Sequence, residues 1–191
     1  QIHSATEYRT AVKLLRDGVI GKVREVHSWI GARGNNYTRM TSAPAPGPAL
    51  ATLNWEIWTG TAPLRKFTPD VYHPFKWRDW QDFGSGALGD FGCHVLDPIF
   101  TALEISTPRS ILARHDGWNS QTWPGEQTLE YEFPGTRWTV GTTLKVTWHD
   151  GGRKPDLALA QMPEGKTLPS GGSLVIGEGG TMVLPHVGLP Q

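Results

Sequence analysis

Three absences limit what this chain of 191 residues can be. It has a single cysteine, Cys93, so an internal disulfide and a multi-cysteine zinc site are excluded. It carries no net charge, because 18 Lys and Arg residues balance 18 Asp and Glu residues, and so no long-range field favours nucleic acid or an anionic membrane. It also lacks any apolar run of the ~20 residues that a membrane-spanning helix needs. We therefore expect a soluble protein with no nucleic-acid partner and no membrane partner.

The length suits one domain with its own core and is short for two. The chain does not begin with Met, and residues 188–191 complete no periodic element. We therefore expect residues 1–191 to form a single domain that is a piece of a longer, two-domain protein. Residues 1–3 do not resemble a signal peptide, and a cytoplasmic location is favoured over a periplasmic one.

Glycine, proline and tryptophan are abundant, with 23, 15 and 9 residues respectively. So many Gly and Pro residues indicate turns and long shaped loops. Tryptophan offers a flat apolar face that serves equally in a core or under a sugar ring. Proline recurs through residues 31–82, which excludes regular structure there, and the aromatic content of this segment indicates an ordered wall around a site.

Hydrophobic spacing predicts the regular elements around that loop. Ser4 and Glu7 match a capping box that starts a helix, Gly18 ends it, and residues 22–30 alternate as a strand. Residues 86–104 have helical spacing with a break at Asp97-Pro98. Short separators between the later strands favour antiparallel pairs; these strands are expected at residues 109–114, 128–133, 137–148, 173–176 and 181–184. The predicted fold class is α+β, an open and predominantly antiparallel sheet with helices packed on one face.

Residues 84–89 match the dinucleotide fingerprint G-x-G-x-x-G, but their context contradicts it. The fingerprint needs a buried strand before the first glycine and a βαβ unit after it. Here the segment from Trp77 to Phe83 precedes the glycines, and antiparallel strands follow. We expect the glycines to allow close approach of a loop to a helix start, and we expect no cofactor-binding residues in this chain.

Asp90, His94 and Asp97 would share one face of a continuous helix. His94 could accept a proton from a substrate hydroxyl, and Asp90 could orient it. A solvated helix face explains the same spacing. A divalent metal would need further ligands that no H-x-x-x-H or cysteine cluster supplies, so no metal site is expected.

The loop before this helix mixes aromatic faces with polar tips. Tyr72, His73, Trp77 and Arg78 could stack on a sugar and hydrogen-bond its hydroxyls, and a self-packed loop would have the same composition.

Four segments resemble the C-terminal half of Gfo/Idh/MocA-family oxidoreductases, most specifically the Gly-Asp-x-Gly-x-His-x-x-Asp block from Gly89 to Asp97. The other three are residues 21–27, 53–60 and 72–78. The resemblance implies an N-terminal Rossmann domain outside this chain that binds NAD or NADP, a sugar or polyol substrate, and a homo-oligomer formed through the open sheet. It assigns catalytic roles to Asp90 and His94. From the residue types and their spacing, we expect Tyr72, His73, Trp77, Arg78 and Asp97 to bind the substrate.

The family also uses a lysine from a Glu-Lys-Pro motif in its Rossmann half. Lys154-Pro155 lacks the glutamate, so the lysine has no match here, and we expect the chain alone to be inactive. A related branch, similar to NAD-dependent α-N-acetylgalactosaminidases, uses the cofactor during glycoside cleavage. A non-catalytic carbohydrate-binding or oligomerisation module is the alternative from another class.

Overall fold

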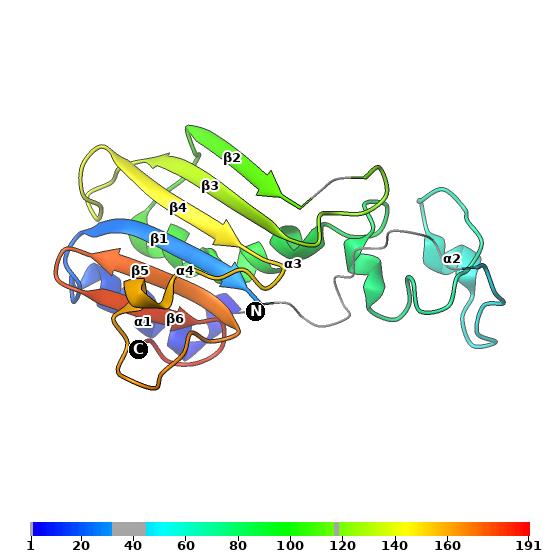
Figure 1. The fold of residues 1–191 in the computed structure, drawn as a ribbon, viewed down its shortest axis with the longest axis horizontal. Helices are drawn as coiled ribbons and strands as arrows, with labels where there is room; N and C mark the ends of the chain where they lie inside the picture. Colours follow the sequence, from blue (N-terminus) through cyan, green and yellow to red (C-terminus); the bar gives the residue numbers. More distant parts are fainter. Residues whose placement is uncertain (1, 32–44, 117–118) are drawn as a thin grey trace.

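The computed structural model describes residues 2–31, 45–116 and 119–191. They form a six-stranded sheet with helices on one face, and a lobe of loops and short helices that projects from the sheet (Figure 1). The helices are η1 (Ile2–Ser4), α1 (Thr6–Arg16), α2 (Trp55–Thr59), η3 (Lys76–Asp79), α3 (Gly86–Val95), α4 (Asp97–Leu103) and η4 (Leu157–Ala160). The strands are β1 (Val23–Ile30), β2 (Ser110–His115), β3 (Gln127–Pro134), β4 (Thr143–His149), β5 (Gly171–Gly177) and β6 (Thr181–Pro185).

The strand order is β2-β3-β4-β1-β5-β6, and only the β1–β4 pair among the described strands is parallel. Strands joined by short connections pair antiparallel, as the separators predict. β1 is parallel to β4 because more than a hundred residues separate them, which leaves room for a crossover. The predicted α+β class with a mainly antiparallel sheet is thus confirmed.

The first helix begins differently from the prediction. Ala5, not Ser4, is its N-cap residue, and no side-chain cap bond forms. Residues 2–4 instead form a 3₁₀ turn in which the Ala5 N–H bonds the Ile2 carbonyl at 2.8 Å. The predicted stop is confirmed, because Gly18 has a φ of 75°.

The main core lies between the sheet and the helices α1 and α4. Leu15 and Ile99 pack there on Val26 and Val146. Val23 joins the same core although it is three residues before Val26, because the strand pairing shifts between Val23 and Glu25. Regular alternation along residues 22–30 would place Val23 on the same face as His27, and the bulge turns it to the face of Val26 instead.

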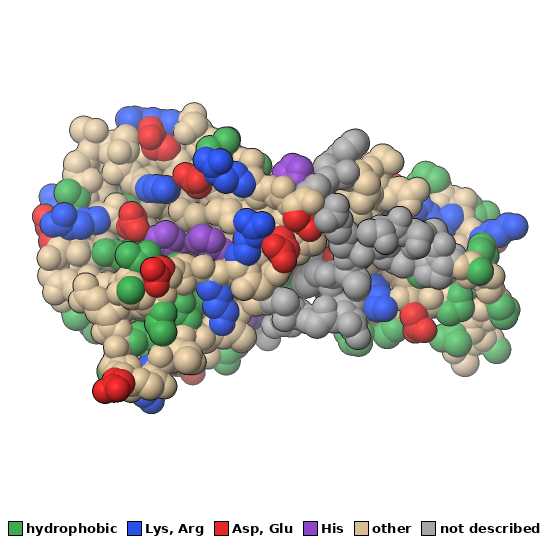
Figure 2. Space-filling view, viewed as in Figure 1, with side chains coloured by type: hydrophobic (Ala, Val, Ile, Leu, Met, Phe, Trp, Pro, Cys, Tyr) green, Lys and Arg blue, Asp and Glu red, His purple; other side chains and the backbone are tan. Residues whose placement is uncertain are grey.

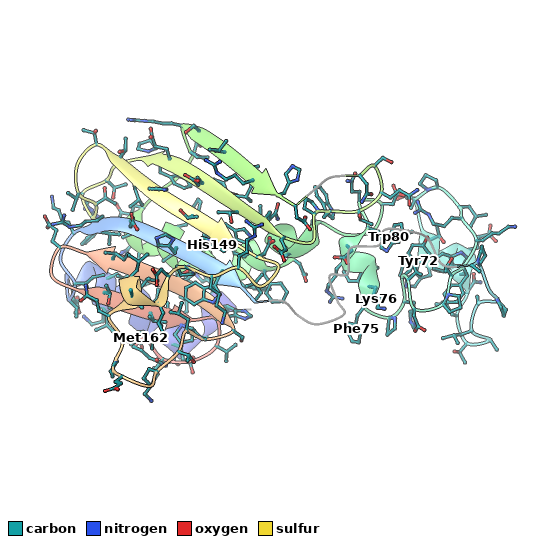
Figure 3. All side chains as sticks on the ribbon, in the orientation of Figure 1. Tyr72, Phe75, Lys76, Trp80, His149 and Met162 are labelled. Carbon is teal, nitrogen blue, oxygen red and sulfur yellow. The ribbon has the colours of Figure 1, made fainter. Side chains whose placement is uncertain are left out.

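The other face of the sheet is half covered. The segment that contains η4 packs Ala160 and Leu168 over Trp29 and Leu174, and Figure 3 shows Met162 on this side. Over β1, β4 and β3 the face stays open, and charged and histidine side chains gather on it (Figure 2).

A hydrogen-bonded chain of three side chains lies on this open part. His27 Nε2 is 2.8 Å from Glu25 Oε1, and His27 Nδ1 is 3.2 Å from His149 Nε2. Burial, followed by the neighbouring His27, lowers the pKa of His149 to about 4 from its ordinary 6.5. Lys145 and Arg153 act in the same direction, and Glu130 opposes them.

The lowered pKa of His149 predicts acid destabilisation. Between pH 6.5 and 4 the unfolded chain binds a proton at His149 that the folded chain does not, so the free energy of unfolding should fall as the pH falls through this window. Denaturant titrations should show that His149→Gln removes about 1–2 kcal/mol of this pH dependence, a value reduced for partial exposure. His115→Gln, on the exposed strand β2, serves as the control. Equal pH slopes for the wild type and His149→Gln would contradict the prediction.

Candidate active-site cleft

An open cleft of about 570 Å³ lies where the start of α3 meets the projecting lobe. Four of its lining residues are polar or aromatic residues singled out in the sequence: Trp77, Arg78, Asp90 and His94. The remaining lining residues are Gln81, Phe83, Gly84, Ser85, Gly89 and Cys93. The structure thus brings together side chains from η3 and from α3, as the predicted wall of loops around a site requires.

The lobe is held together by its own aromatic core. Tyr72 and Trp80 are buried in it, with Trp55, Trp58 and Phe83 packed around them (Figure 3). The centres of neighbouring rings lie 4.8 to 5.6 Å apart, which is contact distance for aromatic rings, and the Tyr72 and Trp80 rings are 4.8 Å apart. Composition left open whether these rings bind ligand or pack, and for this cluster the structure shows packing.

Glycines let the lobe approach α3 closely. A Cβ on Gly84 would lie 2.6 Å from the Arg78 carbonyl oxygen, and one on Gly86 would lie 2.9 Å from the Trp123 ring. Gly86 also has a φ of 66°, and the Trp123 indole donates to the Gly84 carbonyl at 2.9 Å. The fingerprint-like glycines therefore serve the packing of the lobe against the helix, as expected.

The Asp90 carboxylate meets the lobe through an ion pair. Arg78 Nε donates to Asp90 Oδ2 at 3.0 Å, and both side chains are largely hidden from solvent. The guanidinium lies 4.4 Å from the centre of the Trp77 ring and also donates to the Phe75 carbonyl at 3.2 Å. Arg78 is thus engaged on several sides by protein groups.

His94 lies one helical turn beyond Asp90 and borders two cavities. One is the cleft, and the other is a narrow apolar cavity between α1 and the residues that follow β6. The centre of the His94 ring lies 6.1 Å from that of the Phe91 ring and 5.7 Å from that of the His186 ring. His186 is a neighbour that sequence reasoning missed, because no local pattern relates a residue after β6 to a helix more than ninety residues earlier.

Asp97 does not join Asp90 and His94. α3 ends at Val95 and α4 begins at Asp97, so the spacing of one continuous helix does not apply across the break. Asp97 Oδ2 lies 2.8 Å from His3 Nδ1, and its Oδ1 accepts from Thr101 at 3.4 Å. The break itself is confirmed at the predicted place, and it directs Asp97 toward the N-terminal turn.

Tyr72 and His73 also lie outside the cleft. Tyr72 is only 6% exposed within the aromatic core of the lobe, and its ring packs 5.4 Å from that of Trp55. His73 lies edge-on to Trp58 at 6.5 Å. The Tyr72 ring, enclosed in this way, offers no face for a sugar, and neither Tyr72 nor His73 is among the residues that line the cleft with Trp77 and Arg78.

Among the described residues, no three or more His, Cys, Asp or Glu side chains are arranged to hold a metal ion. No helix of the described ranges is long and apolar enough to cross a bilayer.

Comparison with known proteins gives one family match. The model of the GFO_IDH_MocA oxidoreductase family, C-terminal alpha/beta domain, matches residues 6–121. An oxidoreductase from Thermotoga maritima has a similar solved structure, at 15% identity and a TM-score of 0.47. The match covers 97% of this chain and 41% of that one, so this chain spans less than half of its relative's length. No curated protein matches the chain.

The packing around Gly89 predicts an unusual response to alanine. A Cβ at this position would lie 2.4 Å from Ser85 Cβ, so Gly89→Ala should lower the stability by about 1–3 kcal/mol through overpacking. In a Ser85→Gly background the same change should be neutral or stabilising by up to ~1 kcal/mol, because a helix interior prefers Ala to Gly. Thermal unfolding of the wild type, the two single variants and the double variant measures these differences in stability. The prediction is wrong if Gly89→Ala alone leaves the stability unchanged.

Proposed function

We propose, from the premise that this chain belongs to the GFO/IDH/MocA oxidoreductase family and matches its C-terminal alpha/beta domain, that it is the substrate-binding half of an NAD(P)-dependent oxidoreductase acting on a sugar or polyol hydroxyl. The observation that carries the proposal is the placement of Asp90 and His94, four residues apart on α3, in one cleft with the aromatic ring of Trp77. Oxidation of a hydroxyl on a sugar ring needs a base, benefits from a carboxylate that stabilises the protonated base, and needs a surface on which the ring can stack.

His94 is the proposed general base. Its imidazole would accept the proton of the substrate hydroxyl, while the carbon that bears this hydroxyl would give its hydride to NAD(P)⁺, which supplies the oxidising capacity when bound. Asp90, one helical turn earlier, would stabilise the positive charge that develops on that imidazole. Trp77 would support one face of the sugar from the lobe side. Arg78 lines the same cleft, but its contacts with Asp90 and Phe75 leave substrate binding a weaker assignment than the sequence suggested.

The part of the chain that the structure describes does not offer the known fingerprint for a dinucleotide. In the fingerprint-like run 84–89, the three glycines are packed against protein groups, because an added Cβ would meet the Arg78 backbone at Gly84, the Trp123 ring at Gly86 and the Ser85 side chain at Gly89. The residues directly before Gly84 form η3 and a turn rather than the required strand. NAD or NADP would therefore be held by a Rossmann domain outside this chain, and the chain alone would not catalyse oxidation.

A homo-oligomer through the sheet remains part of the proposal. The open half of the sheet offers a polar surface on which charges are already paired, as Arg114 and Lys145 are with Glu130 at 3.3 Å. A contact between copies on this surface would be polar and bridged by water rather than apolar.

Two other functions use the same cleft. A cofactor-dependent glycosidase would need the same base, and Asp90 stands where that branch of the family tends to have Asn. A non-catalytic carbohydrate-binding module would need the Trp77 face and no base. Full-length protein given free sugars and polyols, or nitrophenyl glycosides, separates these: accumulation of reduced cofactor supports a dehydrogenase, release of nitrophenol a glycosidase, and neither a binding module.

Removal of the proposed base predicts a large kinetic loss. In the full-length protein, His94→Ala and Asp90→Asn should each lower kcat by about 10²-fold or more, because general base catalysis supplies this factor. Reduced cofactor formation measures turnover, and His115→Ala on the exposed strand β2 should leave it unchanged. Unchanged turnover in both cleft variants would refute the catalytic role.

The isolated chain of 191 residues should not bind the cofactor tightly. Calorimetric titration with NAD⁺ and with NADP⁺ should give no binding in the micromolar range, because no described segment has the strand-linked glycine turn that holds a pyrophosphate. A micromolar dissociation constant would show that this chain carries its own dinucleotide site.

A further inference from the structure

Arg78 belongs to the lobe, and its charge is paired with that of Asp90 on α3, the helix that also carries His94. Its Nε donates to Asp90 Oδ2 at 3.0 Å, across twelve positions of sequence. The two side chains keep 23% and 30% of their surface exposed, so the pair is shielded from the solvent screening that weakens open ion pairs.

The guanidinium is itself held from the lobe side. Its carbon lies 4.4 Å from the Trp77 ring centre and 5.6 Å from that of Phe75, within cation–π distance. Its Nη1 donates to the Phe75 carbonyl at 3.2 Å. Its backbone packs against Gly84, where any side chain would collide with it.

The short helix that presents Arg78 is fixed in turn. The Trp77 N–H bonds the Tyr72 carbonyl at 2.8 Å, and the Trp80 N–H bonds the Trp77 carbonyl at 3.1 Å. Residues 119–123 then join the lobe to the strands, with the Gln81 N–H on the Gln121 carbonyl at 2.8 Å and the Trp123 N–H on the Asp79 carbonyl at 2.9 Å. A continuous set of contacts therefore runs from the lobe core to the Asp90 carboxylate.

We propose that Arg78 is a positioning residue: it fixes the orientation of the Asp90 carboxylate beside His94, and through it the lobe controls the geometry of the cleft. This assignment rests on the proposed function, and it replaces substrate binding as the main task of Arg78. A guanidinium whose Nε, Nη1 and flat face are engaged by protein groups acts on substrate through Asp90.

Steady-state kinetics of the full-length enzyme separate the two roles. The assay uses the sugar or polyol that gives the highest turnover in the panel described above. Arg78→Ala should lower kcat about 10- to 100-fold, as expected for a misplaced reacting group, with less than about a threefold change in KM. A raised KM with kcat preserved would instead identify Arg78 as a substrate ligand and overturn the proposal.

Chemical rescue tests for the charge itself. Millimolar guanidinium chloride should restore part of the kcat of Arg78→Ala, whereas the same concentration of sodium chloride should not. Arg65→Ala is the matched control, because Arg65 is 22% exposed, pairs with Asp82 and lies over the Phe83 ring at 5.1 Å, all within the lobe. Arg65→Ala should lower the melting temperature, and guanidinium chloride should not raise the kcat of this variant. Absence of rescue for Arg78→Ala would count against the proposal.

A double-mutant comparison distinguishes failure of this inference from failure of the proposed function. If Asp90→Asn and His94→Ala both leave turnover intact, the catalytic role of the cleft fails. If Asp90→Asn lowers turnover as predicted and Arg78→Ala lowers it further in the double variant, only the positioning role fails. The inference predicts no further loss, because both changes remove one unit. In the 191-residue chain, the two changes should lower the melting temperature by less than the sum of their separate effects, and additive effects would contradict the coupling.

Discussion

The close approach of the lobe backbone to the start of α3 is the constraint on which the site depends. It is possible only because Gly84 and Gly86 carry no side chain, so that Arg78 and Trp123 occupy the space above them. Since Gly86 is the first residue of α3 and Gly84 lies just before its N-cap, the contact that closes one wall of the cleft also sets where Asp90 and His94 project. Packing between the lobe and α3 therefore positions these side chains.

Local physics made much of the fold predictable. Apolar spacing and Gly18 define α1, and short separators define the hairpins of the sheet. The errors come from long-range geometry. The bulge that turns Val23 toward the helices depends on its pairing with β5, and the start of α1 depends on a preceding 3₁₀ turn. Neither the bulge nor the preceding turn can be predicted from the residues of the strand or of the helix start alone.

The site was predictable where one helix supplies it. Asp90 and His94 share a face because four residues separate them on α3, and the structure places both in the cleft. Asp97 lies away from both because α3 ends at Val95 and a separate helix begins at Asp97. Tyr72 does not reach the cleft because its ring is buried among the other aromatic rings of the lobe. His186 could be found only once the strand order was known, since it reaches His94 from beyond β6.

Under the proposed function, the Asp90 and His94 side of α3 would face a dinucleotide that another domain holds. The crystal structure of the full-length protein with bound NAD⁺ or NADP⁺ tests it most directly. We expect the nicotinamide ring to lie over the cleft between α3 and the lobe, with its reactive carbon turned toward the space beside His94. A nicotinamide ring bound away from this cleft, with Asp90 and His94 facing solvent, would contradict the account.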